Sequence, residues 1–158
     1  MANTQSMCTS FMGELLTGTH NFGTGVVRAS TAADTFKGAL YLTSATVNAS
    51  TTAYSSTGEV TGSNYSAGGV IVTNATEPSS TNASATAGVA YWTPSGSLVY
   101  TNVTLSTAFD TVLIYNSSQS NKAVSVHTFG SQTITAGTFT LTMPANTTST
   151  ALLRLSTT

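Results

Sequence analysis

Residues 98–105 read LVYTNVTL, residues 112–115 read VLIY, residues 123–129 read AVSVHTF, and residues 138–143 read TFTLTM. In the first and third stretches apolar and polar side chains alternate, as they do along an extended chain with one buried face. Val, Thr, Tyr and Phe, which favour strands, dominate these stretches. The sequence therefore predicts four strands here, with residues 116–121 as a turn between the second and the third.

Similar stretches lie on both sides of this region. They are Asp34–Thr43, Val70–Thr73, Val89–Thr93 and Ala151–Leu155. Seven or eight short strands separated by Gly, Ser and Asn turns predict an all-β fold, an antiparallel β-sandwich of the jelly-roll kind. Two Ser/Thr-rich segments, Thr46–Thr61 and Thr76–Thr86, are predicted to be loops that are too polar for the core and that touch neighbouring molecules.

The N-terminal segment has a different, helical pattern. Asn3 or Thr4 is a suitable cap, Gly18 a suitable stop, and apolar residues between them recur at a spacing of three and four. The sequence predicts an amphipathic helix and arm over residues 1–20, followed by a single sandwich domain over residues 21–158. The candidate docking stripe on this helix consists of Met7, Phe11, Met12 and Leu15.

This stripe has two interpretations. It either lies in a groove on a partner protein or covers one end of the chain's own sandwich, because an uncovered apolar stripe is rarely tolerated. Cys8 shares the stripe and is expected to be a buried small hydrophobe. As the single cysteine of the chain, it excludes an internal disulfide framework.

Charge is scarce in this chain of 158 residues. Only 6% of the residues are charged, against roughly 25% in ordinary globular domains, and Ser and Thr, about a third of the chain, supply the polarity. Such a surface can be covered without desolvating ions, which is the costly part of association. The composition therefore favours a permanent assembly, with a homo-oligomer as the expected state.

The same numbers argue against several classes of partner. Four Lys and Arg residues make no basic footprint for nucleic acid, and no apolar run is long enough for a membrane span. The first residues lack the pattern of a secretory signal, so the expected compartment is the bacterial cytoplasm. Seven Asn-x-Ser/Thr sequons would suit a secreted glycoprotein, but a chain this rich in hydroxyls generates them by chance. They are Asn48, Asn64, Asn74, Asn82, Asn102, Asn116 and Asn146.

Titratable groups are few and scattered, so no catalytic, cofactor-binding or metal-binding residue is predicted. His127 is expected on a strand, on one face with Ser125 and Phe129, as a solvated or singly hydrogen-bonded histidine. His20 is expected to complement the end of the helix. The five acids show no paired setting and are expected to solubilise or cap. They are Glu14, Asp34, Glu59, Glu77 and Asp110.

A carbohydrate-binding sandwich is a further alternative. Lectin sites combine an exposed aromatic platform with acids, and only Tyr91, Trp92 and Asp110 are suitable here. Because neighbours on a strand face opposite sides, one of the two aromatic residues is expected in the core.

Several segments resemble a group of small structural proteins from tailed phages, and together they cover nearly the whole chain. They are MANTQSMCTSFMGELLTGTHNF at the start, DTFKGALYLTSATVNASTTAY and GEVTGSNYSAGG in the middle, and LIYNSS, KAVSVHTFGSQTITAGTFTLTMP and ALLRLS near the end. The segment from Gly23 to Ala33 is longer than this resemblance leads one to expect.

The resemblance implies a non-enzymatic virion component, assembled in the host cytoplasm, that binds the major capsid protein or another virion protein. The leading hypothesis is a capsid decoration or cement protein that bridges major capsid subunits. The alternative is a structural module of the tail, neck or fibre.

Overall fold

The computed structural model describes residues 3–8, 11, 15, 18–22, 33–73, 76–81 and 88–156, except for the side chain of Met7. Eight strands lie within these residues, and all of their pairings are antiparallel. They are β1 (Ser6–Met7), β2 (Phe36–Leu42), β3 (Val70–Ile71), β4 (Ser79–Ser80), β5 (Val89–Trp92), β6 (Leu98–Asn116), β7 (Lys122–Leu141) and β8 (Leu153–Ser156). The larger sheet has the order β1-β7-β6-β2-β3 and the smaller one β4-β5-β8. The all-β, antiparallel fold predicted from the sequence is thus confirmed.

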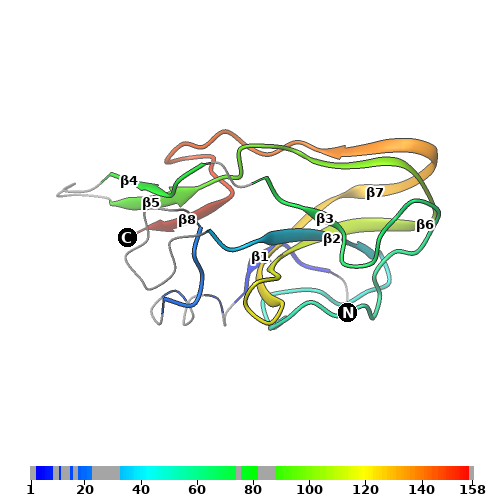
Figure 1. The fold of residues 1–158 in the computed structure, drawn as a ribbon, viewed down its shortest axis with the longest axis horizontal. Coiled ribbons are helices and arrows are strands. Elements are labelled where there is room, and N and C mark those ends of the chain that lie inside the picture. The colour runs from blue at the N-terminus through cyan, green and yellow to red at the C-terminus, as the bar shows by residue number, and fades with distance from the viewer. Residues whose placement is uncertain are drawn as a thin grey trace.

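The long hairpin of β6 and β7 organises the molecule. The two strands run side by side through a bend at the right of Figure 1 and return on a second level. We call this pair the ribbon. Its lower half, around residues 109–116 and 122–128, continues into β2 and β3. Its upper half pairs residues 98–105 with 134–141.

The bend coincides with irregular pairing. The register between β6 and β7 shifts repeatedly between Tyr100 and Thr111, and Ala136 on β7 has a positive φ of 46°. Such bulges bend a strand and increase its twist. The sequence predicted four strands where there are two long ones, because alternation is lost in residues 106–110 and 130–137. The backbone continues to pair there, and Phe109 is fully buried.

Burial of apolar side chains holds the two halves of the ribbon together. Tyr100 of the upper half reaches down to β2, where its hydroxyl donates to the Gly38 carbonyl at 2.8 Å. Position 38 leaves little room for a side chain, because a Cβ there would lie 2.5 Å from the Leu98 side chain, which would have to shift. Phe139 of the upper half contacts Phe109 edge-on at a centroid distance of 5.2 Å. The core therefore lies between the two levels.

An aromatic cluster joins the smaller sheet to the larger one. Phe22 stacks on Phe36 of β2 at 4.7 Å and meets Trp92 of β5 edge-on at 4.8 Å. Phe11 contacts Phe22 at 5.9 Å, so residues on both sides of the expected boundary at residue 20 share one core.

The helix predicted for residues 1–20 is wrong at its start. Ser6 and Met7 form strand β1, which pairs with Val126 and Ser125 of β7. Backbone pairing with an exposed strand edge has overridden the helical spacing, as tertiary contacts often do for short segments. Phe11 and Leu15 have helical backbone conformation, and Gly18, the expected stop, has a φ of 66°; the other positions of the predicted helix between residues 9 and 17 lie outside the described residues.

The segment Thr46–Thr61 is a loop, as the sequence predicted, but it is not too polar for the core. Val47 and Val60 are buried, and Glu59 is only 6% exposed. The segment packs on β2 and β6 of its own chain, where Tyr54 stacks on Tyr115 at 4.7 Å. Of the second predicted loop, residues 79–80 form the short strand β4, and residues 82–86 lie outside the described residues, as does most of the Gly23–Ala33 segment.

Candidate functional site

The candidate docking stripe is only partly described. Phe11 is 1% exposed and packs against His20 and Phe22 of its own chain. Leu15 is half-buried against the same core. The backbone of Met7 pairs with Ser125, while its side chain and the whole of Met12 lie outside the described residues. Cys8 is fully buried, as predicted. Phe11 thus covers one end of its own sandwich, as the second interpretation of the stripe expects.

A buried polar arrangement surrounds Glu59, which the sequence analysis expected to solubilise or cap. Its carboxylate accepts hydrogen bonds from the hydroxyls of Tyr54 at 2.6 Å and Tyr65 at 2.7 Å, and from the Gly68 amide at 2.7 Å. Tyr65 also accepts from the Leu40 amide at 3.0 Å. A buried carboxylate with three donors is satisfied, so Glu59 ties the loops on either side of it to β2.

Three further tyrosines complete this group, which we call the tyrosine cluster: Tyr41, Tyr54, Tyr65, Tyr100 and Tyr115. Burial, with a smaller contribution from the nearby Glu59 charge, raises the pKa of Tyr115 to about 12. Burial likewise raises the pKa of Tyr41 to about 12. The hydroxyls donate to fixed acceptors, for example Tyr115 to the Gly68 carbonyl at 2.8 Å. Neutral phenols that are held in this way are structural donors, not acids or bases that work near neutral pH.

A second polar group lies where β2 begins. The Asp34 carboxylate accepts from the Asn21 amide and from the Asn116 side chain, both at 2.8 Å. Asn116 also contacts Nδ1 of His20 at 3.1 Å. His20 and Asn116 are both buried. The sequence predicted that His20 complements the end of the helix; in the structure its ring is buried in the aromatic cluster.

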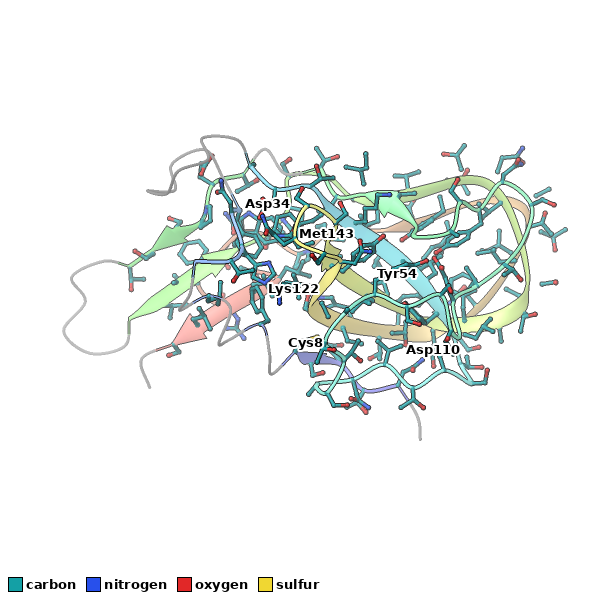
Figure 2. All side chains as sticks on the ribbon, turned by 60° about the horizontal axis from the view of Figure 1, so that its bottom comes forward. Cys8, Asp34, Tyr54, Asp110, Lys122 and Met143 are labelled. Carbon is teal, nitrogen blue, oxygen red and sulfur yellow. The ribbon has the colours of Figure 1, made fainter. Side chains whose placement is uncertain are left out.

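The residues considered for a sugar site do not come together. Trp92 is 3% exposed, and its indole N–H donates to the Thr76 carbonyl at 2.9 Å. Asp110 accepts from Asn3 at 3.0 Å and from Thr111 at 2.7 Å. Figure 2 shows Asp110 and Asp34 well apart, so these two acids do not form a carboxylate pair. The expectation that one of the two neighbouring aromatic residues would be core holds for Trp92.

His127 lies on β7 beside an open hollow of about 510 Å³. Its Nε2 contacts the Ser125 hydroxyl at 2.8 Å, as expected for two residues on one face of a strand. Burial lowers the pKa of His127 to about 4, so the imidazole is neutral at pH 7. A neutral imidazole beside a hydroxyl has the geometry of a base and a nucleophile. Ser125, however, is 1% exposed, and no carboxylate within the described part of the chain orients the ring.

The hollow also contains one cation. The side chain of Arg154 is exposed on β8, and its guanidinium donates to the Thr148 carbonyl at 3.4 Å. Gln5 and Ser6 also line the hollow. Among the residues that the structure describes, no three His, Cys, Asp or Glu side chains gather as metal ligands would. Over the same residues, no helix has the length and hydropathy needed to cross a bilayer.

No known protein family, curated protein or solved structure matches this chain.

The exposed surface over the described residues is mostly hydroxyl. On the outer face of the upper half of the ribbon, Thr101 of β6 and Thr138 and Thr140 of β7 are exposed, and Val99 is 44% exposed beside Thr140. No Asp, Glu, Lys or Arg occurs between Lys122 and Arg154. Sequence reasoning found this uncharged character from composition, but it could not place it on one bent ribbon.

Proposed function

We propose that this chain is a non-enzymatic structural protein of a phage particle, a capsid decoration or cement protein that bridges major capsid subunits in the assembled virion. The observation that carries the proposal is the uncharged, hydroxyl-rich surface of the ribbon. A neighbour can cover such a surface through many hydrogen bonds, direct or through water, without desolvating ions.

The use of the acids in the described core supports the same proposal. Glu59, Asp34 and Asp110 each accept two or more hydrogen bonds from their own chain. They fasten loops to the sheet and so stiffen the surfaces that surround them. A rigid surface loses less conformational entropy when it binds, which favours a protein whose task is adhesion.

The resemblance of the sequence to small structural proteins of tailed phages is the reason for proposing a phage particle as the assembly that this chain joins. A cement protein acts by mass action, because a ligand that binds only the assembled shell stabilises that shell. At free concentrations a hundredfold above the dissociation constant, each bound copy contributes about 2.7 kcal/mol. Hundreds of copies together would raise the resistance of the shell to heat and internal pressure.

Copy number in purified particles tests this proposal. Quantitative mass spectrometry against the major capsid protein is expected to give hundreds of copies per particle. Particles that lack the chain are expected to release DNA at a lower temperature, and adding back the purified chain is expected to restore the original value. Six or twelve copies would identify a tail or neck component instead, and absence from particles would refute a structural role in the virion.

A further inference from the structure

Among the described strands, one edge differs from the others. Four of these strands lie at sheet edges, and each is short: β1, β3 and β4 have two residues and β8 has four. Short edge strands are a common protection against unwanted pairing. The upper half of β7 extends far beyond its two-residue pairing with β1, and beyond Val126 it pairs only with β6 among the described residues.

The neighbouring edge of β6 is covered by its own chain. The Thr104 amide donates to the Ser63 carbonyl at 3.1 Å, and the Asn64 side chain donates to the Asn102 carbonyl at 2.8 Å. These contacts occupy backbone groups that another strand would need. The upper half of the ribbon is therefore covered on its β6 side, while its β7 side has no such cover among the described residues.

We call residues 138–142, which read TFTLT, the β7 edge; β7 itself ends at Leu141. Phe139, Thr140 and Leu141 pair in unbroken register with Tyr100, Val99 and Leu98. The register shifts that twist the ribbon come before Phe139, and the last of them, between Tyr100 and Val103 of β6, lies opposite Thr138. The β7 edge contains no Pro and no charge, although Lys and Pro are the usual protections of an exposed edge.

The side chains of the β7 edge are also incompletely covered. Phe139 and Leu141 point into the core but remain half-buried, while Thr138, Thr140 and Thr142 are exposed on the other face. A strand added beside the β7 edge would extend both faces in register. A two-stranded ribbon gains stability when further strands join it.

We propose that the β7 edge pairs in antiparallel fashion with the β7 edge of a second copy of this chain, giving a two-fold symmetric dimer. An antiparallel pair of identical strands is self-complementary, so one patch serves both partners. Because neither edge carries charge, no ion is desolvated and no like charges meet. The pairing makes a four-stranded sheet across two copies, in which Phe139 of one copy lies beside the inner face of the other.

This dimer deepens the proposed function, because it names the surface through which copies associate. The two proposals have separate tests. Copy number in particles addresses the function, while the oligomeric state of the purified full chain addresses the dimer and needs no particle.

Sedimentation velocity and light scattering of the purified chain, from low to high micromolar concentration, give the first measurement. We expect a concentration-dependent dimer. Thr140→Lys is expected to weaken it by about tenfold or more, because each copy then brings a cation to the middle of the shared edge. The matched control is Thr101→Lys, the same change on the same exposed face but on β6, which is expected to leave the dimer unchanged.

Hydrogen exchange on the unmodified chain gives a second measurement that does not depend on how the variants fold. Amides of residues 138–142 are expected to exchange more slowly at high than at low protein concentration, while those of residues 62–64 stay the same. A chain that is monomeric throughout, or equal effects of the two lysine variants, or exchange at the β7 edge that does not depend on concentration, would each overturn the dimer. A strand from another virion protein as the true occupant would give the first of these results.

Discussion

Replacing Glu59 by leucine tests whether its carboxylate holds the loops to the sheet. Leucine is of similar volume but offers no acceptor to the three donors that now converge on the carboxylate. The Gly68 amide is buried and would be left without its partner, at a cost of about 1–3 kcal/mol, and the half-buried hydroxyls of Tyr54 and Tyr65 would lose about 1 kcal/mol each. We therefore expect Glu59→Leu to lower the free energy of unfolding by about 3–5 kcal/mol. Glu59→Gln keeps one acceptor and is expected to cost about 1–2 kcal/mol.

The assay is equilibrium unfolding in urea, followed by the fluorescence of Trp92, the single tryptophan, which is buried in the aromatic cluster. A double-mutant cycle isolates the contact, since Tyr54 donates to Glu59. Tyr54→Phe is expected to cost about 1 kcal/mol in the natural chain and almost nothing beside Glu59→Leu. The reasoning is refuted by a Glu59→Leu variant within about 0.5 kcal/mol of the natural chain, or by an equal cost of Tyr54→Phe in both backgrounds.

Three other outcomes follow from the structure. Burial lowers the pKa of His127 to about 4, so between about pH 6.5 and 4 this imidazole binds a proton in the unfolded chain but not in the folded one. The free energy of unfolding should therefore fall as the pH drops through this window. His127→Gln should reduce that fall, which acid unfolding curves measure. The pKa values of Tyr41 and Tyr115 are raised to about 12, so above about pH 10 these phenols stay protonated in the folded chain and ionise in the unfolded one. The free energy of unfolding should therefore decline above about pH 10, and phenolate absorbance should rise together with unfolding. Phenolate formation in a fully folded chain at about pH 10 would contradict this. Gly69→Ala should cost about 2–4 kcal/mol in thermal unfolding, because its Cβ would lie 1.7 Å from a carbonyl oxygen at a φ of 72°, while Gly130→Ala, with nothing nearer than 4.0 Å, should change stability by less than about 0.5 kcal/mol.

Local pattern was enough to find most strands. β2, β5 and the turn between β6 and β7 lie where the strand-favouring residues and the turn residues predicted them, although β2 has no exposed residue. The sequence pattern did not indicate that the four predicted strands form two continuous strands, β6 and β7. Bulges shift the register in the bend, so the residues that point into the core change from odd to even positions or back. The apolar–polar alternation is therefore interrupted although the two strands continue to pair.

The polar core was missed for a different reason. Glu59 lies in a segment of Thr, Ser and Gly, and nothing in its immediate neighbours indicates burial. Its partners Tyr54 and Tyr65 flank it at five and six positions, which is a weak signal without knowledge of the chain path. Buried polar groups depend on donors brought together by the fold, and short-range pattern does not contain that information.

The strand β1 was mistaken for a helix because two residues are too few to show any period. Its partner lies 120 positions away along the chain, in β7. The burial of Cys8 and Phe11, by contrast, was readable from their apolar character, although the element that carries them was not.

The pairing of distant segments has a consequence for how the chain reaches its native state. Phe36 of β2 pairs with Asn116 of β6, and Ser6 pairs with Val126 of β7. Closing loops of this size before any contact is made is entropically slow, so folding on the order of milliseconds to seconds is expected. The tight turn at Ser120 and Asn121, both with positive φ, offers a local start, from which the pairing of β6 and β7 can extend outward. During synthesis β2 can therefore pair only after β6 has left the ribosome, and β1 can pair only after β7 has left it.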